Sequence, residues 1–135
     1  MKRACLVTLL TTFAVGLVSV MAGRPAEAHP QFKKEFDNRY IKKAPGTDQE
    51  KSLAESAKVA KCNVCHKGEK KKDRNSYGDA LSKFLTKKDR KDVAKINKAL
   101  DDVEKMHSKA DDPTSPTYGD LIKQGKLPAG EAPPH

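Results

Sequence analysis

The longest apolar stretch of the chain lies near its beginning, over residues 4–22. Lys2 and Arg3 precede it, and a small-x-small triplet ending at Ala28 follows it. A basic start, an apolar run and a small-residue cleavage site are together typical of a secretory signal peptide. We therefore expect residues 1–28 to be cleaved and the remainder to be exported, to a periplasm or an equivalent compartment. The run is also just long enough to span a bilayer, so a retained anchor is the alternative.

Beyond residue 28, apolar residues recur at separations of three and four, which is the spacing of one helix face. This spacing predicts an N-terminal arm, a helix from residue 48 to a cysteine pair, a helix over 77–85, a long helix ending near 108 and a short helix over 117–124. Strand-like alternation is not visible, so we expect an all-α fold of three to four helices. The apolar positions are Phe32, Phe36 and Tyr40; Leu53, Ala57, Ala60 and Val64; Tyr77, Ala80, Leu81, Phe84 and Leu85; Val93, Ile96, Leu100 and Val103; and Tyr118, Leu121 and Ile122.

Capping residues and breaks divide the chain further. Thr47 and Glu50 have the spacing of a capping box, and Ser76 and Thr86 are natural helix starts. We expect an arm over residues 29–46, one domain over 47–127 and a flexible tail over 128–135, which is rich in proline, alanine and glycine. We find no internal repeat in the sequence.

A cysteine–histidine motif, Cys62-Asn63-Val64-Cys65-His66, lies at the end of the second predicted helix. The C-x-x-C-H pattern is typical of covalent haem attachment. Two thiols form thioethers with the vinyl groups of one haem, and an imidazole must stand over the iron. On a helix these three side chains share one face, so His66 is placed to be the proximal iron ligand.

Other functions of the cysteine pair fit the sequence less well. A thioredoxin-like redox pair needs a βαβ context, and a structural zinc site needs four ligands, whereas a second C-x-x-C is missing. The third cysteine, Cys5, falls within the predicted signal peptide. The two remaining cysteines therefore give no disulfide framework, and a disulfide between Cys62 and Cys65 would be strained.

Through this motif the chain resembles the small monohaem c-type cytochromes. The resemblance implies one haem c per chain, bound to Cys62 and Cys65 with His66 on the iron. It also implies that the first helix of the domain delivers the haem ligands. In that family a proline carbonyl soon after the motif typically accepts a hydrogen bond from the proximal histidine. This chain has no proline between His66 and Pro113, so another carbonyl or a water must accept from His66. Tyr77 could bond a haem propionate or belong to the core.

The sixth iron ligand is left open by the sequence. The resemblance favours Met106, the only methionine after residue 28. The apolar stripe of the long helix, extended at 100° per residue, points instead toward His107. His29 and His135 are weaker candidates, and the iron position opposite His66 could also be open.

The expected function is therefore an exported one-electron carrier rather than an enzyme. The alternatives are a haem enzyme or gas-binding sensor with an open sixth position, and a small haem subunit of a larger redox complex. The formal net charge of +9 suits acidic partners, and no helix-turn-helix, zinc-finger or RNA-binding motif indicates nucleic acid. We expect redox proteins as partners and no stable membrane insertion after signal cleavage. A basic run just after the motif could steer such a partner or be a solvated loop; it contains Lys67, Lys70, Lys71, Lys72 and Arg74.

Overall fold

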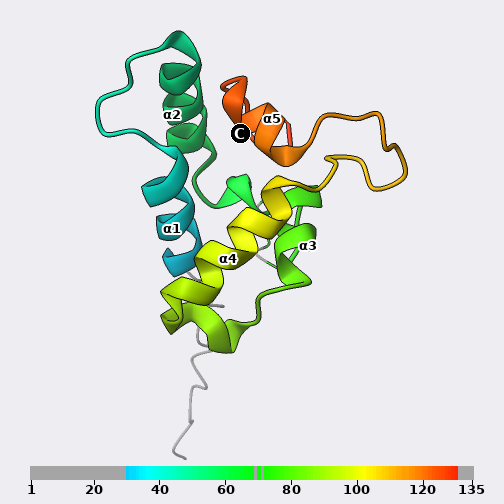
Figure 1. Cartoon of the computed structure of the whole chain (residues 1–135). Helices are drawn as coiled ribbons and strands as arrows, with labels where there is room; N and C mark the ends of the chain where they lie inside the picture. Colours follow the sequence, from blue (N-terminus) through cyan, green and yellow to red (C-terminus); the bar gives the residue numbers. More distant parts are fainter. Residues whose placement is uncertain (1–29, 69, 71, 131–135) are drawn as a thin grey trace, which may run out of the picture.

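A computed structural model of the chain describes residues 30–68, 70 and 72–130. Within these residues the fold is all-α, as predicted, and contains no strand (Figure 1). The described part has five α-helices rather than three or four, together with two 3₁₀ helices. They are α1 (Pro30–Tyr40), α2 (Asp48–Ala60), η1 (Lys61–Val64), α3 (Ser76–Ser82), η2 (Lys87–Lys91), α4 (Val93–Glu104) and α5 (Tyr118–Lys123). No described helix has the length and apolar character needed to cross a membrane.

Helix α4 lies at the centre of the fold and packs against α1, α3 and α5 (Figure 1). Its buried face consists of Ile96, Ala99, Leu100 and Val103, which confirms the predicted apolar stripe except at its first residue. Val93 is exposed because the helix begins there, after an N-cap at Asp92. The predicted start at Thr86 caps η2 instead.

An aromatic cluster joins the N-terminal arm to the rest of the core. The arm is itself a helix, α1, and the Phe36 ring lies 5.0 Å from Tyr40 and 5.9 Å from Tyr77. Tyr77 in turn contacts Tyr118, with ring centroids 5.2 Å apart at a steep angle. Edge-to-face contacts of this kind add to the stability that burial provides. Phe36 and Tyr77 are therefore core residues.

Two helix ends differ from the sequence-based expectation. Helix α2 starts with the predicted Thr47–Glu50 capping box but ends at Ala60, before the cysteine motif. Helix α4 ends at Glu104, so the helical projection toward position 107 does not apply. At the C-terminal end, Leu127 and Pro128 are both buried. Residue 128, the first of the predicted tail, therefore belongs to the packed part of the chain.

The structure reveals an internal similarity that the sequence analysis missed. His66 and His107 each lie in an isolated antiparallel bridge, the first with Arg74 and the second with Thr117. Each histidine follows a helical segment and precedes, by eleven residues, a Tyr-Gly-Asp triplet that opens the next helix. The similarity is one of local geometry, so the apolar periodicity alone did not reveal it.

The glycines of the two triplets both lie against backbone that precedes a histidine, although at different positions: Cys65 is one residue before His66, and Glu104 is three residues before His107. A β-carbon on Gly78 would lie 1.9 Å from the carbonyl oxygen of Cys65. A β-carbon on Gly119 would lie 2.5 Å from Glu104 Cγ and 3.0 Å from the Glu104 carbonyl oxygen. In both units the glycine lets a short helix pack directly on the chain that leads into the histidine loop.

Candidate functional site

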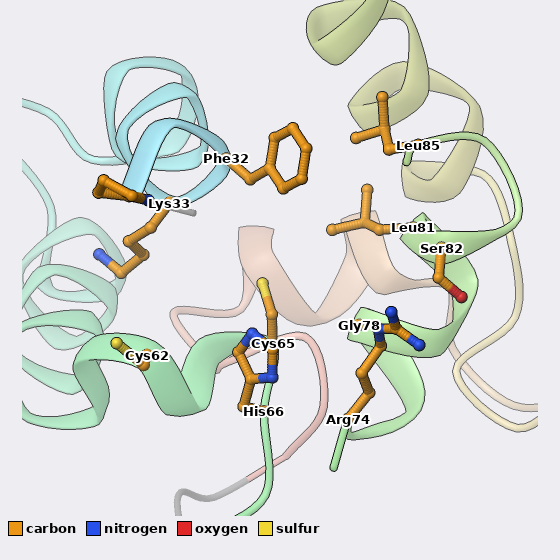
Figure 2. A pocket seen from close by; sticks show the side chains of 11 residues that line it. Phe32, Lys33, Cys62, Cys65, His66, Arg74, Gly78, Leu81, Ser82 and Leu85 are labelled. Carbon is orange, nitrogen blue, oxygen red and sulfur yellow. The ribbon is translucent and has the colours of Figure 1, made fainter. Parts of the chain in front are cut away.

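Cys62, Cys65 and His66 line one pocket between the start of α1, η1 and α3 (Figure 2). The pocket has a cavity volume of about 150 Å³ and is partly open to solvent. The other lining residues are mostly apolar or small: Pro30, Phe32, Lys33, Arg74, Gly78, Leu81, Ser82 and Leu85.

A 3₁₀ turn, rather than an α-helix, positions the cysteine motif. Lys61 follows α2 with φ +49°, a left-handed conformation that ends the α-helix. The chain then tightens, and the amides of Cys65 and His66 both donate to the Cys62 carbonyl, at 3.2 and 3.1 Å. Cys62 is exposed, Cys65 is half-buried, and neither forms a disulfide. The two thiols and the imidazole therefore line the same pocket, although the motif lies in a 3₁₀ turn and not on the α-helix that the sequence analysis expected.

Asn75 fixes the turn from the other side of the loop, and the sequence analysis missed it. Its buried amide nitrogen donates to the carbonyls of Asn63 and Val64, at 2.9 and 3.1 Å. Its side-chain oxygen accepts from the amide of Gly78 at 2.9 Å, which makes Asn75, and not Ser76, the N-cap of α3. One side chain thus ties the cysteine turn to the next helix. The signal available in the sequence was an asparagine directly before a helical apolar pattern.

The loop between His66 and α3 closes on itself. The amide of Lys67 donates to the Asp73 carbonyl at 2.8 Å, and the amide of Asn75 donates to the Cys65 carbonyl at 3.2 Å. With the backbone bridge of His66 to Arg74, these bonds form a short ladder. The basic run is therefore a loop whose two ends are held together beside the pocket.

The exposed positive charge of this loop includes Lys67, Lys70 and Lys72, while Lys71 lies outside the described residues. These lysines do not line the pocket, whereas Arg74 does.

Burial raises the pKa of the Cys65 thiol to about 12, and the nearby Lys33 ammonium offsets only part of this effect. A thiol with such a pKa stays protonated at neutral pH, whereas redox and metal-binding cysteines need the thiolate. Lys33 itself forms an ion pair with Asp37 at 2.5 Å. Among the described residues, no group of three or more His, Cys, Asp and Glu side chains could hold a metal ion. The surroundings of Cys65 therefore differ from those of a reactive thiolate.

Apolar side chains form the wall across from His66. Figure 2 shows Phe32, Leu81 and Leu85 on the side of the pocket away from the imidazole. A flat macrocycle joined to both cysteines would have His66 on one face and hydrocarbon on the other. The residues present therefore fit a covalently bound haem: two thiols, one imidazole and apolar walls.

Met106 and His107, the two candidates for the sixth ligand, line a different hollow. That hollow also contains Asp79, Lys83 and Tyr118 and does not include the cysteine pair. Met106 packs on the core, and the exposed His107 has its ring Nδ1 2.6 Å from the Ser115 carbonyl oxygen. The structure therefore does not bring these two residues together with Cys62, Cys65 and His66. His29 and His135, like the predicted signal peptide, lie outside the described residues.

Tyr77 does not line the cysteine pocket. Its ring is fully buried in the aromatic cluster, and its hydroxyl has no hydrogen-bond partner among the described residues. Burial raises its pKa, so the hydroxyl stays protonated. Of the two roles considered for Tyr77, the structure supports the core role.

No protein-family profile matches the chain, and neither the curated proteins nor the solved structures searched contain a match.

Proposed function

We propose that this protein is an exported monohaem c-type cytochrome that carries single electrons. Cys62 and Cys65 would hold the haem through thioether bonds, and His66 would bind its iron. The observation that carries the proposal is that these three side chains line one largely apolar pocket. Haem attachment also explains why two unpaired thiols lie together in a chain with a signal-like start.

The bound haem would supply the one-electron chemistry, and the chain would supply its surroundings. Phe32, Leu81 and Leu85 would keep water away from the bound haem across the pocket from His66. Asn75 and the short ladder beside it hold the cysteine turn, so that the thiols and the imidazole keep one geometry. The exposed lysines of the 67–72 loop lie next to this site and would attract an acidic redox partner.

Mass spectrometry tests the attachment. The chain should be expressed in a bacterial periplasm together with a c-type haem attachment system. One haem should remain on each chain after denaturation, and Cys62→Ser together with Cys65→Ser should abolish this retention. Haem that is extracted by acid and organic solvent from the wild type would overturn the proposal.

A second candidate function follows from the position of Met106 and His107 in the other hollow. An iron with His66 on one side and hydrocarbon on the other would have an open position for a diatomic gas or peroxide. Carbon monoxide separates the two functions. A pronounced shift of the reduced visible spectrum on adding the gas favours a sensor or enzyme, and an unchanged spectrum favours a carrier with six ligands. Copurification with a larger redox complex would instead identify the chain as its haem subunit.

A further inference from the structure

The cysteine pocket contains one cationic side chain without an ion-pair partner among the described residues. The pocket has three polar side chains besides the haem-binding residues: Lys33, Arg74 and Ser82. Lys33 is engaged with Asp37 at 2.5 Å, and the Ser82 hydroxyl donates to the Asp79 carbonyl at 2.8 Å. Arg74 forms no ion pair with any residue that the structure describes. Its guanidinium is therefore the group available to an anion in the pocket.

The position of Arg74 is fixed by the same ladder that positions His66. The two residues form an antiparallel bridge. Arg74 directly precedes Asn75, whose side chain donates to the Val64 carbonyl and accepts from the Gly78 amide. Arg74 Cβ also lies close to Gly78, at 3.2 Å from where a β-carbon on that glycine would be. The base of the arginine side chain is thus held in register with the imidazole, although its end is exposed.

Arg74 and Cys62 lie at opposite sides of the pocket, with Cys65 and His66 between them (Figure 2). Haem carries its vinyl groups and its propionates at different edges of the macrocycle. When the cysteines hold the vinyl edge, the carboxylates must therefore lie away from them. A carboxylate there would lie beside the exposed guanidinium of Arg74, which is the group best shaped to pair with it.

From this geometry, and resting on the proposed haem attachment, we infer that Arg74 binds a haem propionate. Arg74 thereby differs in role from the lysines of the 67–72 loop, with which it shares a basic run of sequence. The lysines face a partner protein, and Arg74 faces the cofactor.

Removal of the guanidinium should make the haem easier to oxidise. In Arg74→Gln the propionate charge is no longer offset, which favours the ferric state. The equilibrium constant for reduction should fall roughly two- to fivefold, as expected for a partly exposed ion pair, and the midpoint potential should move down accordingly. Arg74→Lys should retain part of the effect because it keeps the charge but loses the planar, two-pronged hydrogen bonding. Lys83→Gln is the matched control, since Lys83 is an exposed cation near the same helix but lines the other hollow.

Infrared spectroscopy gives a direct readout of the propionate. Haem labelled with ¹³C at its carboxylates should show a labelled carboxylate band, in the difference spectrum between oxidised and reduced protein, that shifts in Arg74→Gln and not in Lys83→Gln. The inference is overturned if Arg74→Gln leaves both the potential and the band at wild-type values, or if Lys83→Gln reproduces its changes. These outcomes require covalently bound haem, so failure of attachment would refute the proposed function separately, by mass spectrometry.

Discussion

Gly78 on α3 and Cys65 in the cysteine turn are in such close contact that a side chain at position 78 has no room. A β-carbon there would lie 1.9 Å from the Cys65 carbonyl oxygen and 3.0 Å from its carbonyl carbon. Both obstacles are backbone atoms, so no rotation of a side chain relieves the overlap. The distance between the cysteine turn and α3 therefore depends on the absence of a side chain at this position.

Gly78→Ala should separate α3 from the cysteine turn and destabilise the haem-loaded protein. Overpacking of this kind typically costs ~1–3 kcal/mol, because the backbone has to move. The measurement is the midpoint of denaturant unfolding, followed by the visible spectrum. Gly46→Ala is the control, since a β-carbon at that position would meet only Glu50 Oε2, at 3.9 Å. Equal stability of the two variants would contradict the contact.

Asn75→Ala should destabilise the protein more than Ser76→Ala does. The first change removes a helix cap and leaves the buried carbonyls of the cysteine turn without a donor, at a cost of ~1–3 kcal/mol for an unsatisfied buried group. The second removes an exposed hydroxyl and should change stability by less than about 0.5 kcal/mol. Unfolding of both variants by denaturant compares them. A larger effect of Ser76→Ala would restore Ser76 as the cap that the sequence predicted.

If haem is bound as proposed, Met106→Leu and His107→Ala should leave the visible and near-infrared spectra of the oxidised protein unchanged. The reason is that both residues line the hollow on the other side of α3, and not the cysteine pocket. Loss of a methionine–iron band in the near infrared in Met106→Leu would show that this residue binds iron. Conversion of a low-spin to a high-spin spectrum in His107→Ala would show the same for the histidine.

Reversal of loop charge should slow the encounter with an acidic redox partner. Lys70→Glu together with Lys72→Glu should lower the association rate with an acidic blue-copper protein roughly tenfold at low salt. The difference should shrink as salt rises, because exposed charges are screened beyond ~8 Å at physiological ionic strength. The matched control reverses Lys87 and Lys88 of η2, which are also exposed. An identical loss of rate in the control would show that the loop has no special role and that the basic surface as a whole attracts the partner.

The apolar periodicity predicted the helices that build the core. The stripe of Leu53, Ala57 and Ala60 on α2 is buried, as is most of the α4 stripe. Residues at this spacing share one face of a helix, and the spacing can be read from a short stretch of sequence. The three residues of the motif also line one pocket, and their assignment as haem ligands stays a prediction.

The remaining features depend on contacts between distant segments, which periodicity does not report. The end of α2 is set by a positive φ at Lys61, a residue without any special preference for that conformation. The role of Asn75 depends on carbonyls eleven and twelve residues earlier in the chain. The position of Met106 depends on the end of α4 at Glu104, where the sequence pattern would have allowed another turn.

The paired histidine loops give the molecule a built-in comparison. The loop of His66 adjoins the cysteine pocket, whereas the loop of His107 does not. Both loops have an antiparallel bridge and are followed by a Tyr-Gly-Asp triplet. Amide hydrogen exchange at the two bridges can therefore be recorded in one sample, under identical solvent and temperature. If haem binds at the cysteine pair as proposed, loading it should slow exchange at the first bridge and leave the second unchanged, and the second bridge then serves as the reference within the same molecule.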